Sequence, residues 1–299
     1  MSALVVKAVV AQQIPDDSFT LQIDSPAFLS GEGPVVCIDE AHNNFHTVDG
    51  GYKAFANLLR SDGYVAIGLS ENLESNHLSG CDVVVISNAL AIENATDWSY
   101  PHHSAFNRPE ILALTTWIDQ GGNLLLIADH APMAAAVSGL GAVLGILMAD
   151  LYADGDGTNS NDIFSKSDNT LHLHSITEGR NSNEAIDSIV TFTGQPVQVT
   201  GDWSPLMTFG PSAIAFFNPQ QTLPSFNQAQ IRPFSIAGWT HGATREFGLG
   251  RIVFLGEAAM CTAQLAGPDQ MKMGMNNPEA ANNAQFCLNV VHWLTGIIN

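Results

Sequence analysis

The chain has 299 residues, a length that fits one large domain or two small ones, and 45% of them are hydrophobic, enough for a sizeable core. Lys and Arg number only 10 against 29 Asp and Glu, which gives a formal net charge of −19. Because so few cations are present to neutralise phosphates, we expect binding to neither nucleic acid nor anionic membranes. The acidic, cation-poor composition slightly favours a periplasmic or secreted protein over a cytoplasmic one.

Residues 1–33 are predicted to form an N-terminal arm, and residues 34–299 a single α/β domain. Residues 3–11 are apolar but short, and Lys7 interrupts them. They read as a first strand, a disordered leader or the tail of a signal peptide. Residues 12–33 are expected to lie over the surface of the domain.

The four cysteines include no CxxC pair, which argues against a zinc ribbon. Their apolar surroundings favour four small buried side chains over disulfides. The residues concerned are Cys37, Cys81, Cys261 and Cys287.

Short aliphatic runs alternate with helical patterns through most of the chain, which is typical of a parallel, doubly wound sheet. Residues 149–235 break this rhythm because they are rich in Gly, Asn, Asp and Pro. We expect them to form an inserted irregular or β excursion to one side of the sheet, with its most mobile loops. The predicted parallel strands are 35–38, 64–69, 82–87, 123–128 and 251–256, and the excursion has short strand candidates at 189–193, 196–200 and 213–217.

Polar side chains follow four of the predicted strands at the point where each strand ends. Carboxyl ends of parallel strands meet at one edge of a sheet, where ligands bind in open α/β folds. Imidazoles and carboxylates that converge there suit a divalent metal, zinc above all, or general acid–base chemistry. We therefore assign catalysis to Glu40, Asp129 and His130, substrate binding to Asn44, Asn88 and His103, and metal binding to His42, His46 and Glu257, with Asp39 beside them.

Each of these residues also has a structural interpretation. Asp39 can cap a turn, His130 can donate to a backbone carbonyl, and Glu257 can pair with Arg251. A calcium loop around Asp154 and Asp156 is less expected than a solvated turn, because the spacing is not that of an EF-hand. No Gly-x-Ser-x-Gly elbow and no phosphate-binding glycine motif is present.

Four segments resemble the class I glutamine amidotransferase-like superfamily, and in particular a branch whose domains are found near gliding-motility and ABC-transport proteins. The resemblance implies a flavodoxin-like three-layer α/β sandwich with a mostly parallel sheet. Where amidotransferases carry a cysteine nucleophile, the matching segment here has Asp129 and His130 and no Cys, so amidotransferase activity is not expected. The segments are Gly33-Pro-Val-Val-Cys-Ile-Asp-Glu-Ala-His-Asn-Asn-Phe-His46, Asp62-Gly-Tyr64, Ile127-Ala-Asp-His130 and Asn289-Val-Val-His-Trp-Leu294.

Two classes of function follow from the sequence. The first is a hydrolase, metal-assisted or not, that acts on a small polar substrate such as a carbohydrate or peptide derivative at the carboxyl edge of the sheet. The second is a binding domain that keeps the same cleft without catalysis. Bound metal and loss of turnover on chelation would favour the first class.

Overall fold

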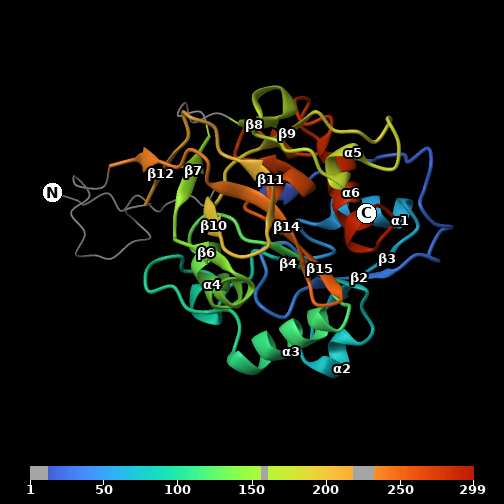
Figure 1. The fold of residues 1–299 in the computed structure, drawn as a ribbon, viewed down its shortest axis with the longest axis horizontal. Helices are drawn as coiled ribbons and strands as arrows, with labels where there is room; N and C mark the ends of the chain where they lie inside the picture. The colour runs from blue at the N-terminus through green and yellow to red at the C-terminus, as the bar shows by residue number, and fades with distance from the viewer. Residues whose placement is uncertain (1–12, 156–160, 218–231) are drawn as a thin grey trace.

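Five parallel strands form the centre of this mixed α/β structure (Figure 1), a computed structural model that describes residues 13–155, 161–217 and 232–299. In β2, β4, β5 and β15 nearly every side chain is buried, as expected for strands covered on both faces, whereas the edge strand β3 leaves Ile67 exposed. Their order in the sheet is β3-β2-β4-β5-β15, and all four pairings between them are parallel. The five predicted strands are thus confirmed, as β2 (Val35–Asp39), β3 (Val65–Leu69), β4 (Val83–Ser87), β5 (Asn123–Ile127) and β15 (Gly250–Leu255).

Beyond β15 the same sheet continues with antiparallel strands. β14 is the antiparallel neighbour of β15, and β10 and then β6 follow it in the sheet. β11 is also paired to β14. Four of the eight pairings in this sheet are antiparallel within the described chain, so the expectation of a mostly parallel sheet is corrected. The added strands are β6 (Ile146–Met148), β10 (Val197–Val199), β11 (Ser204–Thr208) and β14 (Thr240–Phe247).

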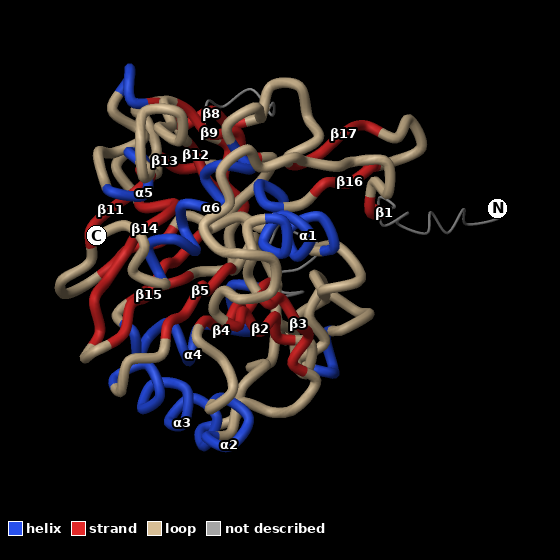
Figure 2. The backbone as a smooth tube through the Cα atoms, turned by 90° about the vertical axis from the view of Figure 1, so that its right-hand side faces the viewer, coloured by secondary structure: helices blue, strands red, loops and turns tan. Residues whose placement is uncertain are grey.

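Helices lie on both sides of the central sheet (Figure 2). Phe55 of α1 and Phe286 of α6 pack on one face, whereas Leu114 of α3 and Leu140 of α4 belong to a second apolar core on the other. Asn107 caps α3 through a capping box with Glu110, which fixes where that helix begins. The helices are α1 (Lys53–Ser61), α2 (Ser75–Leu78), α3 (Arg108–Asp119), α4 (Met133–Leu144), α5 (Ser175–Glu178) and α6 (Asn283–Leu294), with 3₁₀ turns η1 (Ile92–Asn94), η2 (Lys166–Asp168) and η4 (Ala259–Cys261).

Three small antiparallel sheets surround the central one. Two belong to the predicted excursion, and the third pairs the N-terminal arm with the segment that follows β15. The excursion does not lie wholly to one side, because its strands β10 and β11 are built into the central sheet. The small sheets contain β13 (Phe234–Ser235), β12 (Ile214–Phe216) and β7 (Tyr152–Asp154); β8 (Asp162–Ser165) and β9 (Ser188–Thr191); and β1 (Gln13–Pro15), β16 (Ala263–Ala266) and β17 (Met271–Gly274).

All four cysteines form disulfides, which corrects the expectation of four free buried thiols. Cys37 on β2 is bonded to Cys81 just before β4, and Cys261 is bonded to Cys287 on α6. The Cα atoms of the two pairs are 5.8 and 5.9 Å apart, within the normal range for a disulfide. The first bond joins β2 to the segment just before β4, and the second joins the 3₁₀ turn η4 to α6.

Among the helices that the structure describes, none is long and apolar enough to cross a membrane. The apolar residues 3–11 lie outside the described residues.

Candidate functional site

The carboxyl ends of β2, β4, β5 and β15 bring the predicted polar residues to one edge of the sheet. The chain runs from β2 out to β3 and then back past β2 to β4, so the strand order reverses beside β2 and β4. Such a switch point is where α/β sheets place their ligands. The edge presents Asp39 at the end of β2, Ser87 and Asn88 at the end of β4, Asp129 after β5 and Glu257 after β15.

The loop after β2 divides these residues between the two faces of the sheet. Because side chains alternate along a strand, Asp39 points away from the face of Ile38 and towards the face of Cys37. The face of Cys37 packs towards α3 and α4. Ser87 and Asp129 come two positions after Val85 and Ile127 and therefore point to the same face as these residues. This is the opposite face of the sheet, which packs towards α1 and α6. The predicted residues thus form two groups at one edge, one on each face.

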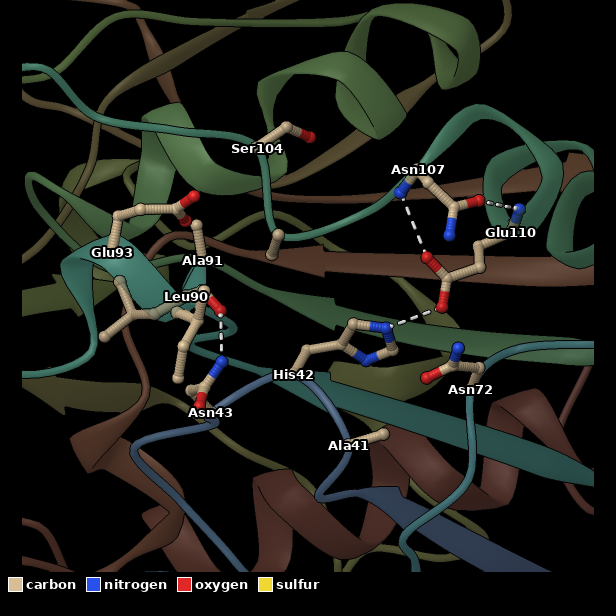
Figure 3. Close-up of a pocket in the computed structure, with 12 residues that line it drawn as sticks. Ala41, His42, Asn43, Asn72, Leu90, Ala91, Glu93, Ser104, Asn107 and Glu110 are labelled. Carbon is tan, nitrogen blue, oxygen red and sulfur yellow. Dashed lines mark hydrogen bonds and ion pairs between the residues drawn. The ribbon is translucent and has the colours of Figure 1, made fainter.

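On the α3 face, His42 is held between the carboxylates of Asp39 and Glu110, and Figure 3 shows its contact with Glu110. Its Nδ1 lies 2.9 Å from both oxygens of Asp39, and its Nε2 lies 2.9 Å from Oε1 of Glu110. Asn44 donates to Asp39 at 3.0 Å, and the backbone N–H of Asn107 donates to the other oxygen of Glu110 at 3.0 Å. Both ring nitrogens of His42 are therefore occupied.

The charge state of His42 follows from this arrangement. Burial alone would lower the pKa of the imidazole, but the hydrogen bonds and negative charges of Asp39 and Glu110 outweigh it and raise the pKa. A protonated ring donates from both nitrogens, which matches two carboxylate partners. His42 is thus suited to hold the loop rather than to bind a metal, which needs a neutral nitrogen with a free lone pair.

On the α1 face, His46 lies in a buried polar group with Ser87 and Tyr52. Its Nδ1 is 3.3 Å from the Ser87 hydroxyl, its Nε2 is 3.5 Å from Nε2 of Gln264, and its ring stacks on Tyr52 with centroids 4.8 Å apart. Burial lowers the pKa of His46 to about 4, although the charge of Asp129 opposes the shift. His46 is therefore neutral at physiological pH.

Asp129 is the member of this group that reaches the surface, with 7% of its area exposed. Its Oδ1 accepts from the Thr193 hydroxyl at 3.0 Å and from the His130 N–H at 2.8 Å, and its own N–H donates to Oδ1 of Asn88 at 2.9 Å. Asn88 holds a left-handed φ of +50°, a conformation that Asn tolerates better than most residues. Within the described residues no donor reaches Oδ2 of Asp129, so one oxygen is fixed and the other is open.

Glu257 is a second carboxyl on the same face, and it is fully buried. Its two oxygens accept backbone N–H groups of Ala259 and Met260 at 2.7 and 2.8 Å. Burial first, and then the negative charge of Asp129, raise the pKa of Glu257 well above its ordinary value. The environment thus favours the protonated form of Glu257.

An aromatic row runs along the surface beside Asp129. His130 stacks on Tyr152 with centroids 4.1 Å apart, and Trp98 lies 6.3 Å from His130 and 6.0 Å from Phe45. Nδ1 of His130 donates to the carbonyl of Ala131 at 2.8 Å, which leaves Nε2 as the open nitrogen. The row gives a partly exposed, flat apolar surface next to the open oxygen of Asp129.

The remaining predicted residues lie apart from Asp129 or serve other contacts. Glu40 points to Gly68 on β3 and accepts the N–H of Val48 at 2.7 Å, so it is placed as a loop cap and not as a base. Asn44 is buried against Asp39, and the side chain of His103 is exposed with no side-chain hydrogen bond among described residues.

Of the predicted metal ligands, His42 lies on the α3 face of the sheet, whereas His46 and Glu257 lie on the α1 face. No group of three or more potential ligands in the described ranges is arranged to hold an ion, and metal binding stays a prediction. Of the predicted calcium loop, Asp156 lies outside the described residues, while Gly155 next to it donates to Asp162 at 2.8 Å.

Three residues that the sequence did not single out belong to the site. Glu110 follows no predicted strand, and Thr193 lies in the excursion, so neither carries a local signal. His241 is the second residue of the antiparallel strand β14, is fully buried, and stacks on Phe164 with centroids 4.9 Å apart. Neither of its ring nitrogens has a hydrogen-bond partner in the described part of the chain.

The fold is similar to that of solved proteins of low sequence identity. The mmIFT52 N-terminal domain matches with a TM-score of 0.60 at 14% identity, over 87% of this chain and 97% of that one. A cytoplasmic protein from Salmonella typhimurium matches with a TM-score of 0.51 at 13% identity, over 88% of this chain and 99% of the other. A ThuA-like protein from Bacteroides uniformis has a TM-score of 0.46 at 11% identity, over 92% and 94% of the two chains. No protein-family model matches the chain, and no curated protein sequence does. The first two similarities show a shared fold and leave the reaction open.

Proposed function

We propose that this protein is a hydrolase of a small polar substrate of the carbohydrate type, which binds over Asp129 at the carboxyl edge of the sheet. We also infer the flavodoxin-like arrangement of the class I glutamine amidotransferase-like proteins, supported by the parallel block with helices on both faces. A thiol nucleophile is not part of the proposal, because all four cysteines are in disulfides.

The observation that carries the proposal is the pair of acids Asp129 and Glu257. Asp129 is oriented by Thr193 and Asn88 and keeps one oxygen open towards the surface, whereas Glu257 is buried with a raised pKa. A carboxyl group with a strongly perturbed pKa near a second acid is common in active sites.

The proposed chemistry uses Asp129 and His130. A water molecule attacks the electrophilic carbon of the substrate, and Oδ2 of Asp129 takes the proton that the water loses. Protonated His130 gives its Nε2 proton to the leaving oxygen as the bond to carbon breaks. Solvent then removes the proton from Asp129 and returns one to His130, which restores both groups.

The aromatic row supports the substrate class. The partly exposed rings of Trp98 and Tyr152 offer flat apolar faces on either side of His130, and such faces pack against the apolar side of a sugar ring. The scarcity of Lys and Arg argues against an anionic substrate.

A binding domain without turnover is the second candidate. It is favoured by the saturation of the surrounding polar groups, since both nitrogens of His42 and both oxygens of Glu257 already have partners inside the protein. Such a network holds a fixed surface well but has little capacity to exchange protons.

The experiment compares wild type, Asp129→Asn and the exposed control Asp202→Asn on a panel of nitrophenyl glycosides and esters. We expect Asp129→Asn to lower turnover by about 10²–10⁴-fold and Asp202→Asn to leave it unchanged. An EDTA arm tests metal assistance. No turnover on any compound, together with ligand-induced thermal stabilisation, would establish the binding domain instead. Equal turnover by Asp129→Asn and wild type would disprove the assigned role.

A further inference from the structure

A cavity of ≈300 Å³ lies on the α3 face of the sheet edge, opposite to the side that holds Asp129 (Figure 3). Its walls come from the loops after β2, β3 and β4 and from the first turn of α3. These are the segments on both sides of the switch point, and the volume is at the lower end of that of ligand sites. The proposed hydrolase reaction does not use this cavity.

The floor of the cavity is rigid and carries a net negative charge. His42 and Glu110 line it, each with 5% of its area exposed, and Asp39 holds His42 from below. Two carboxylates surround one imidazolium, so one negative charge remains uncompensated. None of the residues that line the cavity is Lys or Arg in the described chain, and Glu93 adds a further carboxylate at the rim.

The rim offers polar groups that have no hydrogen-bond partner in the described part of the chain. The side-chain amide of Asn72, Nδ2 of Asn107 and the carboxylate of Glu93 make no hydrogen bond to any described residue, although Oδ1 of Asn107 caps α3. Figure 3 shows Glu93 on one side of His42 and Asn107 and Glu110 on the other. Leu90 forms an apolar strip between them.

We propose that this cavity binds a small organic cation, a protonated primary amine that also carries hydroxyl groups. The ammonium group would lie between the carboxylates of Glu93 and Glu110, where the charge of the cavity is most negative. The hydroxyl groups would exchange hydrogen bonds with the amides of Asn72 and Asn107, which both donate and accept. Anions are disfavoured because no Lys or Arg is among the lining residues and both ring nitrogens of His42 are already paired with carboxylates.

Calorimetric titration with three sugars of similar shape tests the charge preference. Glucosamine is the cationic probe, glucose the neutral one and glucuronate the anionic one. We expect glucosamine to bind, glucose to bind at least about tenfold more weakly, and glucuronate to show no binding. Equal affinity for glucosamine and glucose, or no binding of glucosamine, would overturn the proposal.

Variants locate the binding in this cavity. Glu93→Gln is expected to lower glucosamine affinity by roughly two- to fivefold, as for a partly exposed ion pair, and raised salt should have a similar effect. Glu71→Gln, an exposed acid outside the lining, is the matched control and should change nothing. An equal effect of the two variants would show that general surface charge attracts the amine and would disprove the site.

Asp129→Asn separates this site from the proposed reaction. Glucosamine binding should be unchanged in that variant even where turnover is lost, because Asp129 lies on the other face. A loss of glucosamine binding in Asp129→Asn would place the amine at the hydrolase site and refute a separate cavity site. Thermal melts of each variant check that it is folded, which is expected because Glu93 and Glu71 are exposed and neither side chain has a partner among the described residues.

Discussion

His42 and His46 lie four positions apart in one loop, yet they serve opposite faces of the sheet. His42 is hydrogen-bonded to Glu110 on α3, whereas His46 stacks on Tyr52 beside α1. The loop is fixed to the one after β4 by two backbone hydrogen bonds, from Phe45 to Asn88 at 3.2 Å and from Leu90 to His42 at 2.8 Å. The two rings are therefore in different environments and have pKa values shifted in opposite directions.

His42→Ala should lower the free energy of unfolding by about 3–5 kcal/mol, because Asp39 and Glu110 would face each other without the imidazolium. A raised folded-state pKa contributes stability that is fully present below the unfolded pKa of about 6.5 and is lost as the pH rises through the folded pKa. The gap between wild type and His42→Ala should therefore be larger at about pH 5.5 than at about pH 9.

Urea denaturation at both pH values measures this difference. His103→Ala, an exposed histidine, is the control and should lose less than about 0.5 kcal/mol. A loss below about 1 kcal/mol for His42→Ala, with no pH dependence, would contradict a role for His42 in holding the loop.

The sequence predicted the parallel block well because buried parallel strands are uniform aliphatic runs. Residues 83–87 and 123–127 need no tertiary information to be recognised, and polar residues after them mark the carboxyl edge. The sequence predicted β10 as the short strand 196–200 but not its place in the central sheet, because a short strand carries no signal for its partner. β6 has only three residues, too few for a periodic pattern.

The partners within the site depend on contacts that sequence spacing does not reveal. Glu110 meets His42 from 68 positions away, and the disulfides join residues 44 and 26 positions apart. The sequence correctly predicted that the strand ends meet at one edge of the sheet. The prediction did not include the face of the sheet to which each side chain points. Because alternate residues of a strand point to opposite faces, the predicted ligands were divided between two sites.

Glu257→Gln should reduce the loss of stability that the wild type shows as the pH rises above about 4.5. An acid with a raised folded-state pKa contributes stability that is present below its unfolded pKa, near 4.5, and lost as the pH rises through the folded pKa. Wild type should therefore lose stability relative to Glu257→Gln as the pH is raised from about 4.5 towards neutrality. Denaturation curves of both proteins at several pH values measure this trend. Parallel pH profiles would mean that Glu257 is ionised in the folded protein.

Removal of either disulfide should lower the free energy of unfolding by about 2–5 kcal/mol, because each closes a loop of the unfolded chain. Thiol titration in guanidinium without reductant should find no reactive thiol, and full reduction should release all four. Paired replacement, Cys37→Ser with Cys81→Ser or Cys261→Ser with Cys287→Ser, separates the two contributions. Two stabilising disulfides would support the proposed periplasmic or secreted location, since such bonds persist in oxidising compartments. Four thiols titrated without reductant would argue for a reducing one.

His241→Phe should remove part of the acid sensitivity of the fold. Burial lowers the pKa of His241 to about 4, although Asp129 opposes the shift, so the unfolded chain binds a proton that the folded protein rejects between about pH 4 and about pH 6.5. Stability therefore rises with pH in this window for wild type, and Phe at position 241 should flatten that rise.

The absolute stability of His241→Phe is the less informative quantity. The ring lies against Gly194 and Gly256, where an added Cβ would approach it to 2.3 and 2.8 Å, so a larger ring brings packing strain. The slope of stability against pH is independent of that strain and is the readout. An unchanged slope would show that His241 is not buried as a neutral ring. A flattened slope together with lost turnover would add His241 to the groups that serve Asp129.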